Sequence, residues 1–180
     1  MTFRLIFAAL LVGAPAYADC PPAPDISNAQ SALLAEVQGP TNETRAREIS
    51  QELWVLWATA PDQQAQELLD YGMAARATFD FNRAIEFFDR LVDYCPDYAE
   101  GYNQRAFASF LREDYESALS DLNLALERSP KHVAAMSGKA LTLIGLGREE
   151  EAQDVLRQAL RLNPWIPERG LLKGPPEKDI

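Results

Sequence analysis

The residues of this chain that could carry out chemistry are few and far apart. The sequence contains one histidine, His132, and two cysteines, Cys20 and Cys95. A multi-histidine metal site is therefore impossible, and two distant cysteines cannot form a zinc knuckle. A nucleophilic pair of Cys95 and His132 would need the fold to bring the ends of two segments together, whereas a surface histidine beside a helix start is the ordinary outcome. We therefore expect no catalytic residue, no metal and no cofactor.

Two other motifs that invite a chemical interpretation are better explained by helix structure. The sequence Gly145-Leu146-Gly147 lacks the preceding strand and the spacing of a phosphate-binding loop, and it is typical of a helix-terminating turn. Three glutamates follow at 149–151, where the partial positive charge of a helix N-terminus favours acidic residues. Acid–base pairs that form only in three dimensions stay open as an alternative. Because the sequence shows no catalytic motif, an enzyme is nevertheless the least favoured class.

The two cysteines could instead have a structural role. Outside the cytosol, Cys20 and Cys95 could form the one intrachain disulfide that the sequence allows. Closing so long a loop would contribute about 4 kcal/mol to stability in the chain-entropy description. The alternative is that Cys95 is a small buried hydrophobic residue and that Cys20 is unpaired. The sequence leaves both interpretations open.

The first eighteen residues have the pattern of an export signal. Arg4 precedes the apolar run 5–12, and the small-x-small sequence Ala16-Tyr17-Ala18 follows. This pattern predicts a signal peptide over residues 1–18 that is cleaved after Ala18, and a periplasmic location. The apolar run is shorter than the roughly 20 residues that a transmembrane helix needs. An uncleaved membrane anchor is the alternative, but we expect no membrane insertion after cleavage.

The charge of the chain argues against one large class of partners. The sequence has 17 Lys and Arg residues against 27 Asp and Glu residues, which gives a formal net charge of −10 at pH 7. An acidic surface repels the phosphate backbone of nucleic acids. We therefore expect no nucleic-acid partner, and we interpret the charges as solvated helix faces.

The sequence repeats with a period of 34 residues, and the repeated elements would position any functional residue. Proline recurs at positions 96, 130 and 164, and five columns of small or large apolar residues recur at the same interval. Several columns in register across three units make a chance origin improbable. The columns are Leu68, Tyr102 and Met136; Gly72, Ala106 and Ala140; Ala84, Ala118 and Ala152; Phe88, Leu122 and Leu156; and Leu91, Ala125 and Ala159.

Each unit has the pattern of two helices joined by a turn. In the first unit, apolar residues over 68–79 follow helical spacing, residues 80–82 provide a turn, and a second apolar stripe covers 84–92. Small residues such as Gly72 and Ala84 let the two helices approach closely where they cross. The following proline ends the second helix because it lacks the backbone N–H of the next helical hydrogen bond.

This pattern resembles the tetratricopeptide repeat, and the resemblance covers residues 65–166. The first unit contains Leu68, Tyr71, Gly72 and Ala75, followed by Ala84, Phe88 and Pro96, and the other units repeat the columns given above. Where the family usually has Trp in the first helix, this chain has Leu68, Tyr102 and Met136, which are also large and apolar. The resemblance implies an all-α, right-handed solenoid of three helix-turn-helix repeats with a concave binding face.

The repeat pattern also suggests how the whole chain is organised. We expect Trp54 and Trp57 to pack on the first repeat, and the segment from Trp165 to Leu172 to fold back over the last helix. The expected parts are a signal peptide at 1–18, a Pro-rich linker at 19–25, a degenerate helical pair that caps the array at 26–64, repeats at 65–98, 99–132 and 133–166, and a short C-terminal cap with a disordered tail at 167–180.

The resemblance further implies which residues face a partner. The best-known variant of the family grips a C-terminal carboxylate with Lys, Asn and Arg. The corresponding residues here are Leu69, Met73, Gln104, Ala134 and Gly138, so the role of a receptor for chaperone tails is contradicted. The alternative is that the chain's own residues 21–24 or its Trp165 region cover these side chains, or that the side chains pack between helices. The expected groove residues are Gln66, Leu69, Met73, Arg76, Glu100, Asn103, Phe107, Phe110, Ser137, Leu141 and Ile144.

These observations predict a binding protein rather than an enzyme. The hypothesis is a non-catalytic scaffold for protein–protein interaction that binds a peptide or helix in the concave groove and takes part in envelope protein assembly. Such a protein would be a monomer or would self-associate weakly. The alternative is a self-associating structural protein whose exposed repeat ends stack on one another.

Overall fold

The computed structural model describes residues 19–174, and within this range the chain is entirely helical, with no strand. The all-α fold class is therefore confirmed. The predicted signal peptide and the last six residues of the predicted tail lie outside the described residues. The helices are α1 (Ser27–Gln38), α2 (Glu43–Trp57), α3 (Gln63–Ala77), α4 (Phe81–Tyr94), α5 (Ala99–Leu111), α6 (Tyr115–Arg128), α7 (Val133–Gly145), α8 (Glu149–Leu162) and the 3₁₀ helix η1 (Pro167–Leu171).

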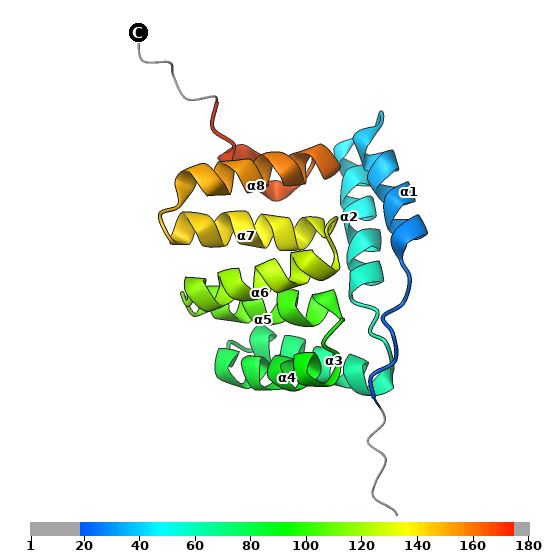
Figure 1. Cartoon of the computed structure of the whole chain (residues 1–180). Helices are drawn as coiled ribbons and strands as arrows, with labels where there is room; N and C mark the ends of the chain where they lie inside the picture. Colours follow the sequence, from blue (N-terminus) through cyan, green and yellow to red (C-terminus); the bar gives the residue numbers. More distant parts are fainter. Residues whose placement is uncertain (1–18, 175–180) are drawn as a thin grey trace, which may run out of the picture.

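Helices α3 to α8 form three antiparallel pairs that stack in chain order (Figure 1). Each pair turns at a residue in the left-handed conformation, namely Phe79 (φ 63°), Glu113 (φ 61°) and Gly147 (φ 71°), which are equivalent positions of the period. In the first two pairs an aspartate follows the turn, and Asp80 and Asp114 accept backbone N–H hydrogen bonds at the starts of α4 and α6. Such caps satisfy donors that the helix itself leaves unpaired.

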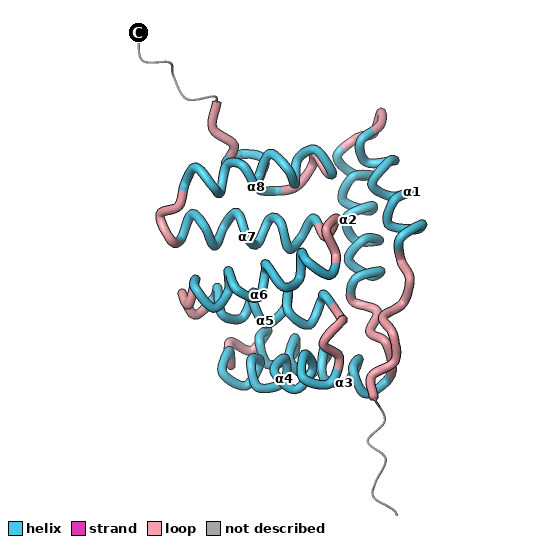
Figure 2. The backbone as a smooth tube through the Cα atoms, in the orientation of Figure 1, coloured by secondary structure: helices cyan, strands magenta, loops and turns pink. Residues whose placement is uncertain are grey.

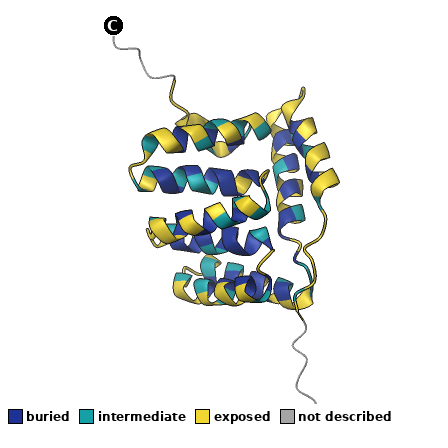
Figure 3. Cartoon of the chain, viewed as in Figure 1, coloured by how far each residue is buried: buried dark blue, intermediate teal, exposed yellow. Residues whose placement is uncertain are grey.

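Small residues allow the paired helices to come into close contact. A Cβ atom added to Gly72 of α3 would overlap the ring of Phe88 on α4, which is fully buried. The equivalent alanines Ala106 and Ala140 are also buried. The repeated column of small residues therefore marks the places where the first helix of each pair meets the second. Figure 3 shows buried residues along the inner faces of the stacked helices and exposed residues along their outer faces.

The N-terminal hairpin, which we define as α1 and α2, does not continue the stack. It runs crosswise along one side of the stacked helices, as Figures 1 and 2 show. Its buried stripe, which includes Ile49 and Leu53, belongs to the same core cluster as Val133 and Met136 of α7 and Leu156 of α8. The hairpin therefore packs on the third helix pair, far along the sequence from its own position.

The expectation that both tryptophans pack on the first repeat is wrong. The ring of Trp57 stacks on His132, with a centroid distance of 4.1 Å, and Trp54 is 39% exposed. The apolar stripe of α2 is buried in one core cluster with residues of α7 and α8, and this burial favours the observed position of the hairpin.

The C-terminal segment returns along α8 as expected, but only part of it is buried. Ile166 lies in the core cluster shared by α2 and α7, and the side chain of Gln153 on α8 donates to the carbonyl of Leu171. Leu171 and Leu172 themselves are exposed, so the prediction that these two side chains cover the last helix is wrong. The hydrogen bond from the side chain of Gln153 to the backbone of this segment, rather than burial of apolar side chains, holds this end of the segment.

A disulfide joins Cys20 and Cys95, with a Cα–Cα distance of 5.2 Å. Cys95 directly follows α4 and is buried, and Cys20 lies in the nonhelical segment before α1. The N-terminal part of the chain is thus attached to the first helix pair by this bond and to the third pair by the packing of the hairpin.

Candidate binding site

A pocket of about 440 Å³ lies where α2 faces the first helices of the three pairs. Helices α3, α5 and α7 each contribute side chains to it, and α2, Leu122 of α6 and residues of the segment 163–168, which includes the start of η1, form the remaining walls. Its lining consists of Ser50, Leu53, Trp54, Trp57, Arg76, Asn103, Gln104, Ala106, Phe107, Phe110, Leu122, Val133, Ala134, Ser137, Gly138, Leu141, Asn163, Ile166, Pro167 and Glu168.

Large apolar side chains remain open to solvent in this pocket. Phe107 of α5 is 45% exposed, and Trp54 approaches from α2 with a similar exposed fraction. Phe110 is half-buried, because its ring also lies 5.5 Å from that of Tyr115. Exposed aromatic side chains inside a concave site are typical of surfaces that bind other molecules.

Six of the predicted groove residues line the pocket. They come from three different helices that the repeat pattern aligned. They are Arg76 of α3, Asn103, Phe107 and Phe110 of α5, and Ser137 and Leu141 of α7.

The other five predicted residues are used differently. Leu69 is fully buried and Glu100 is 2% exposed, so the prediction that they line an open groove is wrong. Leu69 belongs to a core cluster with Ala58 and Ala60, which shows that the connection after α2 covers this part of α3. The remaining three lie away from the pocket: Gln66 accepts a hydrogen bond from the backbone N–H of Ala60, and Met73 and Ile144 pack against core clusters.

Sequence reasoning missed the contribution of α2. Leu53, Trp54 and Trp57 form one wall of the pocket, so the chain covers part of its own concave face with α2 and not with residues 21–24. The Trp165 region contributes its next residues, Ile166 to Glu168, as the alternative interpretation expected. Trp54 and Trp57 were the one sign in the sequence that α2 packs on another part of the chain. A local pattern of this kind does not identify which distant surface the helix contacts.

A buried polar network lies beside the pocket. The carboxylate of Glu100 accepts hydrogen bonds from the side chains of Asn103 (3.0 Å) and Gln104, and it lies 2.8 Å from Nε2 of His132. His132 is 1% exposed, so the expectation of a surface histidine is wrong. Its Nδ1 accepts the backbone N–H of Ala135 at the start of α7, which leaves Nε2 as the nitrogen that donates to Glu100.

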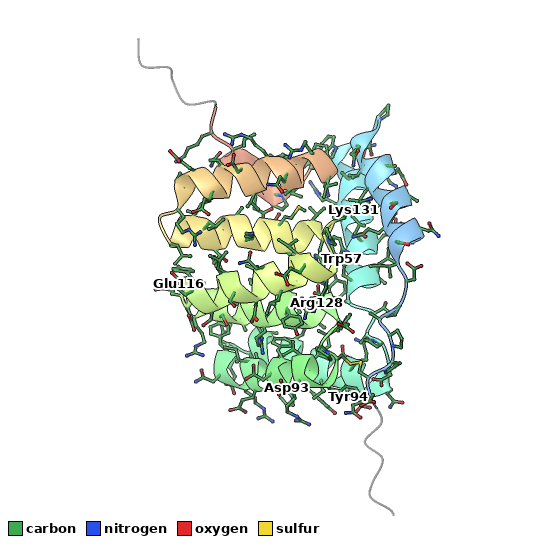
Figure 4. The ribbon with its side chains drawn as sticks, in the orientation of Figure 1. Trp57, Asp93, Tyr94, Glu116, Arg128 and Lys131 are labelled. Carbon is green, nitrogen blue, oxygen red and sulfur yellow. A yellow bond between two sulfur atoms is a disulfide. The ribbon has the colours of Figure 1, made fainter. Side chains whose placement is uncertain are left out.

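This network joins the pocket to the N-terminal hairpin. Trp57 covers the ring of His132 at the end of α2, and Figure 4 labels Trp57 where α2 meets the stacked helices. The hydroxyl of Tyr98 also donates to the backbone carbonyl of Trp57, at 2.7 Å, and burial raises the pKa of Tyr98. Hence the wall of the pocket is fixed by both aromatic stacking and hydrogen bonds.

Arg76 is the cationic side chain of the pocket lining. Its guanidinium donates to the side chain of Gln104 and lies over the ring of Phe107, 4.4 Å from the centroid. Burial lowers the pKa of Arg76, and the negative charge of Glu100 acts in the opposite direction. Arg76 forms no ion pair within residues 19–174, so part of its hydrogen-bonding capacity is available to a ligand.

The described residues contain no group of three or more His, Cys, Asp or Glu side chains that could hold a metal ion. In residues 19–174, no helix has the length and hydropathy needed to cross a membrane.

Comparison with known proteins agrees with this architecture. Residues 109–165 match the family model for the tetratricopeptide repeat. A TPR repeat-containing protein of Rhizobium etli is 26% identical over 118 residues, which cover 66% of this chain and 58% of that protein. A tetratricopeptide repeat protein 36 homolog of Nematostella vectensis is 41% identical over 73 residues, which cover 41% of this chain and 40% of that protein. The chain spans about half the length of these curated relatives.

A solved structure shares the arrangement of the helix pairs. The first TPR domain of Spaghetti (RPAP3), bound to the HSP90 peptide SRMEEVD, is 26% identical and aligns with a TM-score of 0.59 over 61% of this chain and 86% of that domain. The three stacked helix pairs therefore share the fold of this TPR domain, and residues 109–165 match the tetratricopeptide repeat family.

Proposed function

We propose that this protein is a non-catalytic interaction scaffold that binds a short, largely apolar segment of another protein in the pocket between α2 and the repeats. The observation that carries the proposal is the exposure of Trp54 and Phe107 inside a concave pocket built from three repeats. The similar TPR domain of Spaghetti binds a peptide, which supports this class of function.

The lining defines what kind of segment fits. Trp54, Phe107 and Leu141 offer apolar contacts, and aromatic anchors of this kind contribute most of the binding energy at many interfaces. Arg76 and Asn103 supply hydrogen-bond donors for backbone carbonyls or for an acidic group of the ligand. The preformed walls reduce the entropy that is lost on binding.

The size of the site favours a short extended segment over a long helix. A volume of about 440 Å³ is in the range of small-molecule sites and holds only a few side chains. Moreover, α2 already occupies the part of the concave face next to α7, where its buried stripe contacts Val133 and Met136. A long helix along the whole concave face would have to displace α2.

The partner differs from the HSP90 peptide of the similar domain. That peptide, SRMEEVD, carries acidic residues near its end. In this chain the positions that grip such an end in the family are Leu69, Met73, Gln104, Ala134 and Gly138, which include no cation. We therefore propose an apolar ligand segment rather than a chaperone C-terminus.

The cellular setting is part of the same proposal. The N-terminal pattern of residues 1–18 favours export to the periplasm, and a Cys20–Cys95 disulfide fits an oxidising compartment. A binding scaffold in that location would serve envelope protein assembly.

Selection of binding peptides from a random library tests the binding function, with affinities measured by calorimetry. Phe107→Ser removes an apolar anchor from the pocket, so we expect it to weaken binding of the selected peptides by about tenfold or more. Leu111→Ser is the matched control, because Leu111 also lies on α5 and is exposed outside the pocket. Equal affinity of Phe107→Ser and the wild type would contradict the assignment of the pocket.

A further inference from the structure

The first helix pair forms one end of the stack. The N-terminal hairpin packs on α7 and α8, and Figure 1 shows no described helix beyond α4 at that end of the stack. As a result, Tyr71 of α3 is 57% exposed and its ring lies 5.5 Å from that of Phe87 on α4. An aromatic pair therefore lies at the centre of an open helix face.

Two arginines flank this aromatic pair. The guanidinium carbons of Arg83 and Arg90 each lie 5.8 Å from the centre of the Phe87 ring, one helical turn before it and one after it. The surface is also hollowed beside Phe87, where these arginines and Glu86 line a depression with Asp80 and Asn82.

The charged side chains of this face alternate in sign along α4. Their spacing of three and four residues is the spacing at which ion pairs form within a helix. Nevertheless, within the described part of the chain none of the four is in an ion pair, although other pairs at this spacing are formed, such as Arg148 with Glu151. The four exposed residues are Arg83, Glu86, Arg90 and Asp93.

A helix with this order of charges is complementary to a second copy of itself that runs in the opposite direction. If a second α4 lies antiparallel to the first, Arg83 faces Asp93 of the other copy and Glu86 faces Arg90. Both contacts then occur twice, as a two-fold axis requires. A parallel arrangement in register would instead place like charges opposite each other, which is unfavourable. The order of the charges therefore selects one orientation.

We propose that this face of α4 is the interface of a symmetric dimer of the chain, with the two α4 helices antiparallel and the Phe87 rings near the two-fold axis. The aromatic pair supplies the apolar centre and the four charges supply the polar rim, which is the usual composition of a protein interface. The pocket lies on the side of the repeats that faces α2, so dimer formation leaves it open.

Sedimentation of the purified, disulfide-bonded protein tests the proposal over a concentration range of about 1 to 300 µM. We expect the average mass to rise from monomer to dimer over this range, and the transition to move to higher concentration when salt is added, because salt screens exposed charges. A wild-type protein that stays monomeric throughout, or that forms open-ended oligomers, overturns the proposal.

A charge exchange identifies the face. The double variant Arg83→Glu/Arg90→Glu has only acidic groups at these four positions of α4, and Glu86→Arg/Asp93→Arg has only basic groups there. Each variant alone should remain monomeric, while their equimolar mixture should form a dimer. All four side chains are exposed, and circular dichroism checks that the helices are retained. Dimers of either variant alone, or a mixture that stays monomeric while the wild type dimerises, contradict the antiparallel α4 interface.

Discussion

At the scale of single residues, the most constrained group of this protein is the buried carboxylate of Glu100. It is surrounded by the side chains of Asn103, Gln104 and His132, and each of the three can donate a hydrogen bond to it. A buried charge is tolerated only when such partners are present. The sequence offered no signal for this arrangement, because the family register places Glu100 on the concave face.

Replacement of His132 by Ala should therefore be strongly destabilising. The change leaves Glu100 without one of its donors and removes both the ring under Trp57 and the cap of α7, so we expect a loss of about 3 to 5 kcal/mol in the free energy of unfolding. Urea denaturation measures the loss. Lys131→Ala, on the exposed neighbour, is the control and should change the free energy by less than about 0.5 kcal/mol. Similar values for the two variants would show that the network is not stabilising.

Gly72 gives a second test at this scale. Because an added methyl group would overlap the buried ring of Phe88, Gly72→Ala should reduce the free energy of unfolding by about 1 to 3 kcal/mol. Gly170→Ala serves as the control, since a Cβ atom there meets nothing within 4 Å. Thermal or urea denaturation compares the two. A neutral Gly72→Ala variant would mean that the column of small residues is not required for helix contact.

At the scale of elements, the sequence predicted the helices well and the position of one hairpin wrongly. The residues that recur every 34 positions make the contacts between successive helices from α3 to α8. The pattern predicts these contacts because each repeat touches mainly its neighbours in the sequence. The apolar stripe of α2 also predicted a helix. Its contacts with Val133 and Met136 are far away in the sequence, and no periodic pattern records which distant surface a stripe will cover.

The disulfide determines how firmly the N-terminal hairpin is held. Without the bond, a Cys20→Ser/Cys95→Ser variant should lose up to about 4 kcal/mol of stability in the chain-entropy description. The loss should appear locally, as faster hydrogen exchange in α1 and α2 than in α5 and α6. Mass spectrometry of exchanged peptides provides the measurement, and a uniform change across all helices would contradict a role for the bond in holding the hairpin.

At the scale of the whole molecule, the pocket lies where the predicted groove faces α2, and the chain buries other parts of that groove itself. The six predicted residues among those that line the pocket follow from the repeat register. Leu69 has the equivalent position on α3, but it is buried in a core cluster that includes Ala58 and Ala60. The binding site thus combines a part that is periodic, and therefore predictable, with the irregular cover supplied by α2.

The crosswise hairpin also changes how this molecule assembles. An open row of repeats has only neighbour contacts, so it starts to fold at any point and frays from its ends. Here the side chains of Gln30 and Gln38 on α1 donate to the carbonyls of Lys131 and Leu162, which links the N-terminal hairpin to the third helix pair. The N-terminal hairpin can therefore reach its native position only after the third repeat has been synthesised. Contacts between residues so far apart in the sequence slow folding, because a long loop must close before they form.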